Sequence, residues 1–149
     1  MNIRTELQPV KPDPAQVAEL AALADKIVSY MDRRLDYEPL IERYNSQSRQ
    51  QYTITDFDLM AGSVDSDEFA EDSLFPCPQI HDDVTDAEYE EIFRTARTLE
   101  ISGVEQHYWA TFLEINLRSR SLHDLVYEDH DLTPAQMLAE ARDRRPIAL

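Results

Sequence analysis

Apolar residues recur at helical spacing in every long segment of this 149-residue chain. The longest such run spans residues 14–36, where apolar positions follow one another three and four residues apart. Asp13 precedes this run and Pro14 opens it, which is a combination typical of a helix N-terminus. A second helix can begin at Pro39, followed by a polar connection over residues 45–51. The pattern therefore predicts a helical first half.

The segment that follows has a weaker pattern. Residues 52–55 have side chains that favour a short strand, but two short helices fit the whole segment better. The first would span residues 56–61, with Thr55 as its N-cap and Gly62 at its end. The second would span about residues 66–73.

Two prolines then divide the chain. In Pro76-Cys77-Pro78 both prolines lack a backbone donor, and each restricts the residue before it, so we expect an extended segment. We interpret this segment as a boundary between a helical N-terminal extension over residues 1–78 and a second domain over residues 79–149.

The second half contains four helix-start signals. They are centred on Thr85, Ser102, Ser121 and Thr133. The third helix would be a single turn that ends at Tyr127, and Pro146 would end the fourth. The helix after Ser102 is apolar around most of its circumference, so one side should be core and another can be a contact surface. The prediction for the whole chain is an all-α protein whose second half is a small four-helix bundle.

The charge of the chain is acidic and unevenly distributed. There are 30 acidic and 14 basic residues, for a net charge of -16. Residues 50–93 contain 13 acids and neither Lys nor Arg, whereas the residues on either side are nearly balanced. Phosphate backbones and anionic membranes repel such a chain, so we expect no direct nucleic-acid or membrane binding. The acidic segment is either a solvated surface or a face that meets a basic partner.

The sequence does not indicate a catalytic, cofactor or metal site. A single cysteine, Cys77, excludes an internal disulfide and a multi-thiolate zinc site, and two glycines are too few for a Gly-rich phosphate loop. Asp65-Ser66-Asp67 begins like a calcium loop, but Phe69 and Ala70 stand where a ligand and the turn glycine belong. The four histidines lack zinc-helix spacing, so a metal-dependent enzyme is the least favoured class. The polar start and the charged residues within the most apolar stretch predict a cytoplasmic protein.

Four motifs of the second half occur in a recognisable order. They are Thr85-Asp86-Ala87-Glu88-Tyr89, the acidic and apolar face of Glu105 to Phe112, the turn from His123 to Asp129, and Asp131 with Thr133-Pro134. In this order they resemble the immunity proteins of the colicin E and pyocin DNase family, over about residues 80–146. Members of that family are small acidic four-helix proteins that block a nuclease made by the same cell. Tyr127-Glu128-Asp129 stands where the family has Tyr-Tyr-Pro, and residues 1–78 have no counterpart.

The resemblance implies a function and a set of contact residues. In the family, the second helix sets specificity and the third supplies a shared anchor. The toxin-binding residues that it implies for this chain are Glu105, Gln106, Trp109, Leu113, Asp124, Tyr127 and Glu128. We therefore expect a bacteriocin immunity protein that neutralises a cognate toxin, a basic nuclease, without being an enzyme. The alternative function is that of an acidic adaptor or DNA-mimic protein that binds another basic protein. For Trp109, the alternative to a contact residue is a place in the core.

Overall fold

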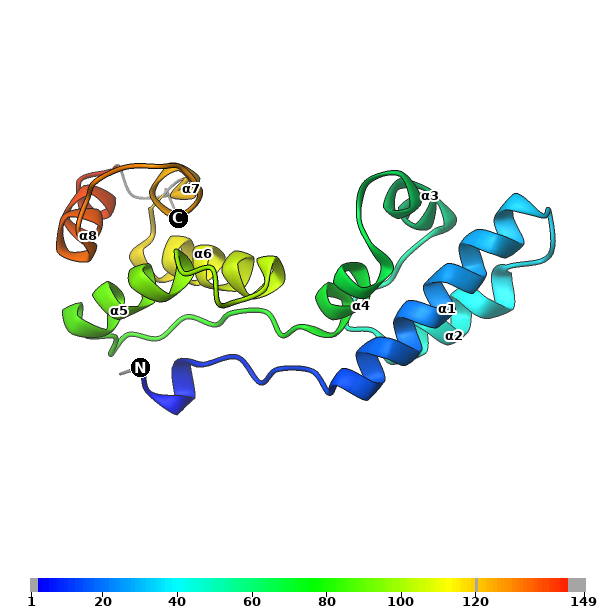
Figure 1. The fold of residues 1–149 in the computed structure, drawn as a ribbon. Helices are drawn as coiled ribbons and strands as arrows, with labels where there is room; N and C mark the ends of the chain where they lie inside the picture. The colour runs from blue at the N-terminus through cyan, green and yellow to red at the C-terminus, as the bar shows by residue number, and fades with distance from the viewer. Residues whose placement is uncertain (1–2, 120, 145–149) are drawn as a thin grey trace. The chain divides into compact units, whose positions relative to one another are not determined.

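The computed structural model describes residues 3–119 and 121–144, and within these ranges it contains eight α-helices, one 3-10 helix and no β-strand (Figure 1). The predicted all-α class is confirmed. None of the described helices is long and apolar enough to cross a membrane. Pro146, which was predicted to end the last helix, lies outside the described residues.

The chain forms two compact units, and one of them is inserted into the other along the sequence. The inserted unit is residues 10–76, and the split unit combines residues 1–9 with residues 77–149. The second boundary falls within the Pro76-Cys77-Pro78 segment, which is not helical. Residues 3–9 were expected to belong to an extension over residues 1–78, but they pack with the second half of the chain.

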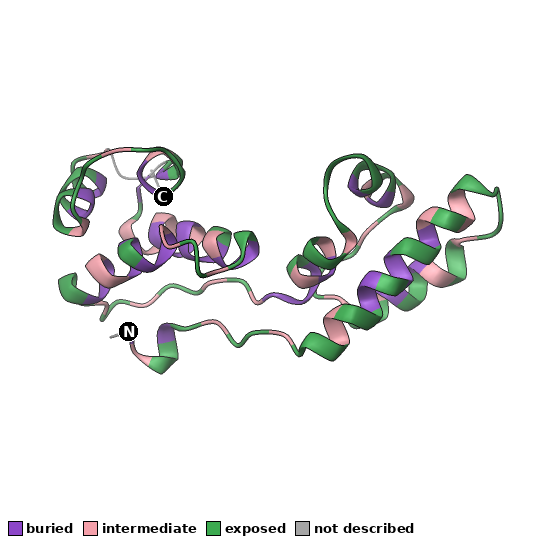
Figure 2. Ribbon diagram, in the orientation of Figure 1, coloured by how far each residue is buried: buried purple, intermediate pink, exposed green. Residues whose placement is uncertain are grey.

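The inserted unit consists of four helices around an apolar core. They are α1 (Pro14–Asp32), α2 (Glu38–Gln47), α3 (Ile54–Ser63) and α4 (Ser66–Leu74). Asp13 caps α1, because its side chain accepts a hydrogen bond from the Ala15 N–H at 3.1 Å, and Pro14 is the first helical residue, as predicted. Figure 2 shows buried residues along one side of α1, and these include Leu20, Ala24 and Ile27.

Four aromatic rings meet at the centre of the inserted unit. Every pair among Tyr44, Tyr52, Phe57 and Phe69 has ring centroids between 4.9 and 6.1 Å apart. Ser73 Oγ donates to the Phe69 carbonyl at 2.8 Å, so the Tyr44 hydroxyl is the donor in its 2.7 Å bond to Ser73 Oγ. This chain of bonds satisfies two buried hydroxyl groups inside an otherwise apolar core.

The C-terminus of α1 differs from the prediction. The helix ends at Asp32 rather than near residue 36, because Arg34 adopts a left-handed conformation with φ 56°. The Leu35 N–H then donates back to the Tyr30 carbonyl at 2.8 Å, which closes the last turn. Leu35, expected on the apolar face of this helix, lies outside it and is exposed.

The start of α3 also differs from the prediction. The N-cap is Thr53 rather than Thr55, because Thr53 and Asp56 form a capping box in which the Thr53 N–H donates to Asp56 Oδ2 at 2.7 Å. Residues 54 and 55 are therefore helical, and the alternative of a short strand is wrong. Gly62 lies inside α3 instead of ending it, and Val64 is the C-cap.

The split unit contains one 3-10 helix and four α-helices. They are η1 (Thr5–Leu7), α5 (Asp86–Ala96), α6 (Gly103–Leu117), α7 (His123–Tyr127) and α8 (Pro134–Asp143). The predicted caps Thr85, Ser102 and Thr133 are confirmed, since each accepts a hydrogen bond from the backbone N–H three residues later. Ser121 is not a cap: α7 begins at His123, and Leu122 precedes it without a side-chain cap.

Residues 3–8, the N-terminal segment, complete the core of the split unit. Leu7 is 1% exposed and Ile3 is also buried. The Leu7 carbonyl accepts a hydrogen bond from the Tyr108 hydroxyl on α6 at 3.3 Å. Arg4 donates to Glu88 on α5 at 2.6 Å and to Asp83 at 2.9 Å. These contacts join the two separate stretches of chain that form the split unit.

Candidate partner-binding surface

The short helix α7 presents one large aromatic side chain to solvent. Leu125 and Val126 are buried, whereas Tyr127 is 43% exposed and Asp124 is half-buried. A single turn therefore directs its aliphatic residues inward and its tyrosine outward, as expected for a tyrosine that the family resemblance places among the contact residues. An exposed tyrosine combines a large apolar ring with a polar hydroxyl, a combination that is common at protein interfaces.

The backbone around Tyr127 is fixed by side chains from other elements. One guanidinium nitrogen of Arg97, at the end of α5, donates to the carbonyl oxygens of Leu125 at 2.9 Å, Val126 at 3.2 Å and Glu128 at 2.9 Å. The last carbonyls of a helix have no partner within it, so these bonds close the C-terminus of α7. The Leu125 carbonyl also contacts His130 Nε2 at 2.9 Å.

Asp124 is bound within the chain itself. Its two carboxylate oxygens accept hydrogen bonds from the two terminal nitrogens of Arg144, at 2.7 and 2.6 Å. Arg144 also donates to the Ser121 carbonyl at 2.6 Å, and its hydrogen bonds lower the pKa of the Asp124 carboxyl. The Asp124 carboxylate is thus paired with Arg144 at the end of α8. The role of Asp124 as an open anchor needs correction, because it links α7 to α8.

Acidic side chains and one imidazole accompany Tyr127 on the surface. The His123 ring lies against the Tyr127 ring, with centroids 5.3 Å apart. Glu128 and Asp129 follow directly and are exposed. Together, His123, Tyr127, Glu128 and Asp129 form what we call the Tyr127 surface. It offers an aromatic centre with negative charge beside it.

The predicted specificity face of α6 lies in the core. Trp109 is 1% exposed, and both Leu113 and Glu105 are buried. Trp109 Nε1 lies 3.3 Å from Glu105 Oε2, to which it donates, and the indole packs edge-on against Tyr108. These side chains cannot contact a partner, so their predicted role in toxin binding is wrong, and for Trp109 the alternative of a place in the core is confirmed.

The reason is that α6 is covered from more than one direction. Leu7 contacts α6 through the Tyr108 hydroxyl, in addition to the packing of α6 against α5. Gln106, the remaining member of the predicted face, is half-buried and donates to the Ala96 carbonyl at 2.9 Å. The broad apolar circumference of α6 therefore serves the core and not an interface.

The acidic segment 50–93 is divided between the two units. Seven of its acids belong to the inserted unit and six to the split unit. In the split unit, four of the six pair with arginines that lie outside the segment or at its edge. These acids and their partners are Asp83 and Glu88 with Arg4, Asp86 with Arg142, and Glu91 with Arg94. The guanidinium of Arg4 lowers the pKa of Glu88 and Asp83, and that of Arg142 lowers the pKa of Asp86.

These arginines are the residues that the sequence-based reasoning missed. The composition of the chain indicates such ion pairs, since 12 of its 14 basic residues are arginine. Arginine is suited to bidentate and partly buried ion pairs, whereas lysine favours solvent. An acidic chain that uses arginine almost exclusively is expected to hold its basic residues in specific pairs.

The described residues do not bring together a metal site. No group of three or more His, Cys, Asp or Glu side chains within residues 3–119 and 121–144 is placed to hold a metal ion. Asp65, considered as the start of a calcium loop, is the N-cap of α4 and accepts from the Asp67 N–H at 2.8 Å. Cys77 is exposed.

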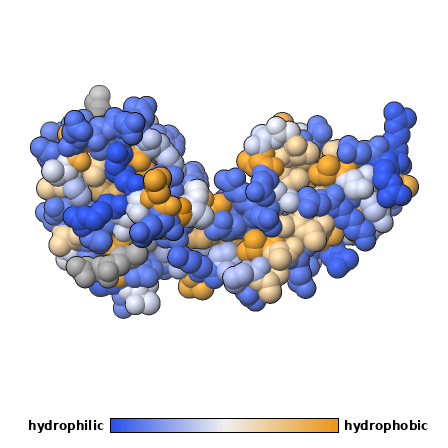
Figure 3. Space-filling model, viewed as in Figure 1, coloured by the Kyte–Doolittle hydropathy of each residue, from blue (hydrophilic) through white to orange (hydrophobic). Residues whose placement is uncertain are grey.

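The exposed large apolar side chains include Val10, Leu59, Ile80 and Leu99. Figure 3 shows hydrophilic residues over most of the face in view, with apolar residues in smaller separate areas.

No protein-family model, curated protein or solved structure matches the chain.

Proposed function

We propose that this chain is an immunity-type inhibitor that binds a basic bacterial toxin, with a nuclease domain as the preferred class, through the Tyr127 surface. The observation that supports this proposal most directly is the exposure of Tyr127 on a single helical turn whose neighbours are buried and whose carbonyls are held by Arg97. A rigid aromatic side chain loses little conformational entropy on binding, which favours it as the centre of an interface.

The charge of the chain supports the same class of partner. A nuclease presents a basic surface to the phosphates of its substrate, and a net charge of -16 gives this chain the opposite potential. The same charge disfavours direct contact with nucleic acid. Inhibition by blocking a surface requires no catalytic group, cofactor or metal from the inhibitor. The proposed place of action is the cytoplasm, where a cell must neutralise a nuclease that it makes.

The contact set differs from the one implied by the family resemblance. Tyr127 and Glu128 remain candidates, because both are exposed. Trp109 and the buried α6 residues are replaced by the exposed neighbours of Tyr127, namely His123 and Asp129.

The test uses a purified basic nuclease domain, with the product of the gene next to the one for this chain as the first candidate. We expect an equimolar amount of the chain to suppress cleavage of plasmid DNA by that domain. Tyr127→Ala should weaken binding by roughly thirtyfold, which corresponds to about 2 kcal/mol for a central interface tyrosine. Leu99→Ala is the matched control, because Leu99 belongs to the same unit and is 100% exposed.

Thermal melting of each variant separates binding from folding. Tyr127→Ala should melt close to the unsubstituted chain, since its ring is only partly buried. A collapsed melting point with unchanged affinity per folded molecule would make Tyr127 a structural residue. Undiminished DNA cleavage in the presence of the unsubstituted chain would overturn the proposed function.

A further inference from the structure

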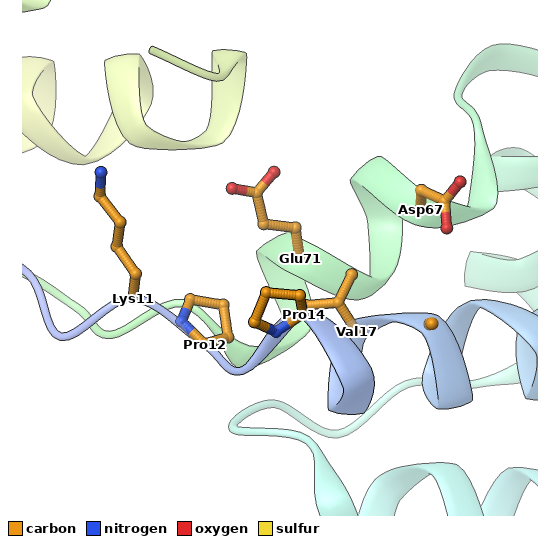
Figure 4. Close-up of a pocket in the computed structure, with 7 residues that line it drawn as sticks. Lys11, Pro12, Pro14, Val17, Asp67 and Glu71 are labelled. Carbon is orange, nitrogen blue, oxygen red and sulfur yellow. The ribbon is translucent and has the colours of Figure 1, made fainter.

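The inserted unit has a groove between the start of α1 and helix α4, with a volume of about 320 Å³ (Figure 4). Pro12 and Pro14 line one side, and Asp67 and Glu71 project from α4 on the other. Lys11 at the rim and Glu71 both interact within the chain. The charges of the groove are therefore partly compensated, and its lining identifies no particular ligand.

In the split unit, by contrast, His130 has two hydrogen bonds that define the state of its ring. Its Nε2 lies 2.9 Å from the Leu125 carbonyl oxygen on α7, and its Nδ1 accepts a hydrogen bond from the Leu132 N–H at 3.1 Å. A carbonyl oxygen only accepts, so Nε2 carries a hydrogen, and a backbone N–H only donates, so Nδ1 carries none. Both bonds form together only when the imidazole is neutral, with its hydrogen on Nε2.

Addition of a proton to this ring removes one of the two bonds. In the imidazolium both nitrogens are donors, so Nδ1 no longer accepts from the Leu132 N–H, whereas the bond from Nε2 to the Leu125 carbonyl can persist. Histidine is the side chain that gains its proton between about pH 8 and pH 5. The loop between α7 and α8 is therefore held at both ring nitrogens at neutral pH, and at one of them at acidic pH (Figure 1).

The nearest charge on another element is a cation. Arg97, at the end of α5, donates to the same Leu125 carbonyl oxygen at 2.9 Å. On α7, the Asp124 carboxylate is already bound by Arg144, and the first turn of α8 has no charged side chain. A charged His130 ring in its present position therefore meets the like charge of Arg97.

The carboxylates that could attract a charged ring belong to the loop itself. Three exposed acids lie within two residues of His130, namely Glu128, Asp129 and Asp131. Within the part of the chain that the structure describes, the ring forms no ion pair with any of them. The charged ring can reach such a partner only if the loop changes its conformation.

We propose that His130 is a pH-sensitive switch for the loop that follows α7. The neutral ring holds Leu132 to the C-terminus of α7 and so restrains the loop that carries Glu128 and Asp129. When the ring gains a proton, the Leu132 N–H is released and the imidazolium turns toward the acids of the loop. Glu128 and Asp129 belong to the Tyr127 surface, so acidification changes both their position and the charge beside them. The inference concerns the chain alone and does not rest on the proposed function.

Nuclear magnetic resonance of the isotope-labelled full chain between pH 8 and pH 5 tests this switch without a partner. At pH 8 we expect the ring nitrogens of His130 to show a protonated Nε2 and a bare Nδ1. On acidification, the ring and the Leu132 amide should titrate with the same midpoint. The protection of the Leu132 amide against hydrogen exchange, relative to an unstructured amide at the same pH, should fall roughly fivefold, as expected for the loss of one hydrogen bond.

Three variants separate the charge of His130 from other effects of pH. His130→Gln has a donor and an acceptor at every pH, so the Leu132 amide should stop responding to acidification. His130→Lys has a charge and no acceptor, so its Leu132 amide at pH 8 should resemble that of the unsubstituted chain at pH 5. His123→Gln is the matched control, because His123 titrates against the Tyr127 ring but does not bind Leu132. This control should keep the full response of the Leu132 amide.

Several outcomes would overturn the inference. They are a hydrogen on Nδ1 at pH 8, a Leu132 amide that does not follow the titration of the ring, and an unchanged response of that amide in His130→Gln. A response that disappears in His123→Gln would assign the switch to the wrong histidine. A nuclease domain that fails to bind the chain would overturn the proposed function and leave these measurements unaffected, so the two failures are distinguishable.

Discussion

Leu7→Ala should destabilise the split unit and leave the inserted unit unaffected. The Leu7 side chain is 1% exposed, and its carbonyl accepts a hydrogen bond from Tyr108 on α6. Truncation of a fully buried leucine to alanine costs about 2–5 kcal/mol, because transfer free energy is lost and a cavity remains. We expect about 3 kcal/mol, since the short N-terminal segment can partly collapse into the cavity. This is a large part of the ~5–15 kcal/mol that stabilises a typical domain.

Tryptophan fluorescence measures the split unit separately. The only tryptophan of the chain, Trp109, lies in the core of that unit. A loss of about 3 kcal/mol lowers the urea midpoint by roughly 1.5–2 M if the slope is about 1.5–2 kcal/mol per M. Far-UV circular dichroism reports both units, so the part of its transition that belongs to the inserted unit should stay unchanged.

Val10→Ala is the control, because Val10 follows the N-terminal segment closely, at the first position of the inserted unit, and is 81% exposed. Its urea midpoint should indicate a change of less than about 0.5 kcal/mol in the free energy of unfolding. If Leu7→Ala leaves the fluorescence midpoint unchanged, or if both variants shift it equally, the N-terminal segment is not part of the core and the reasoning is refuted.

Four further predictions concern the ionisation of two carboxyl groups, a buried hydroxyl group and association with a toxin. Arginines lower the folded-state pKa values of Glu88 and Asp124, so these carboxylates stabilise the fold above their unfolded pKa of about 4, and this stabilisation is lost as the pH falls further. The urea midpoint measured by fluorescence should therefore drop below about pH 4. A constant midpoint would contradict this prediction. Arg144→Gln should raise the pKa of Asp124 in a nuclear magnetic resonance titration, whereas Arg142→Gln should not. Tyr44→Phe should cost the inserted unit about 1 kcal/mol by circular dichroism, and a stabilised variant would refute the role of its hydroxyl. Association with a toxin should slow as the salt concentration rises, because charges are screened beyond about 8 Å at physiological ionic strength. An on-rate that does not depend on salt in stopped-flow mixing would argue against electrostatic steering.

Local signals in the sequence predicted most of the helices. The caps Asp13, Thr85, Ser102 and Thr133 act over three residues or fewer, so a linear pattern is sufficient to identify them. The errors occur where two local solutions compete. Thr53 and Thr55 are both acceptable N-caps, and the choice was decided by the reciprocal bond between Thr53 and Asp56.

Long-range contacts were the part that sequence patterns could not provide. Arg4 meets Glu88 across 84 positions, and Tyr108 meets Leu7 across 101. No periodicity encodes such a pair, so residues 3–9 were assigned to the wrong half of the chain. The contact between the N-terminal segment and α6 was also unknown when Trp109 was assigned to an interface. The sequence shows that the surface of α6 is apolar, but it does not show which segment covers that surface.

The candidate site was predictable to the extent that it is local. The inward and outward directions on α7 follow from the geometry of a single turn, so the exposure of Tyr127 agrees with the expectation. The partner of Asp124 comes from the end of α8, 20 positions away, and was not predictable from the α7 motif. A short motif can thus resemble that of a family while one of its residues is paired by a distant part of the chain.

The insertion of residues 10–76 has a consequence for biosynthesis. The N-terminal segment leaves the ribosome before the inserted unit, but its partners on α5 and α6 are translated afterwards. At roughly 5–20 residues per second, about 100 intervening residues correspond to about 5–20 s of waiting. During this time Ile3 and Leu7 have no core to enter, whereas the inserted unit already has all of its helices and can fold. A chaperone that recognises short apolar stretches on nascent chains would therefore find its target in the first residues, and would have to release them when α6 emerges.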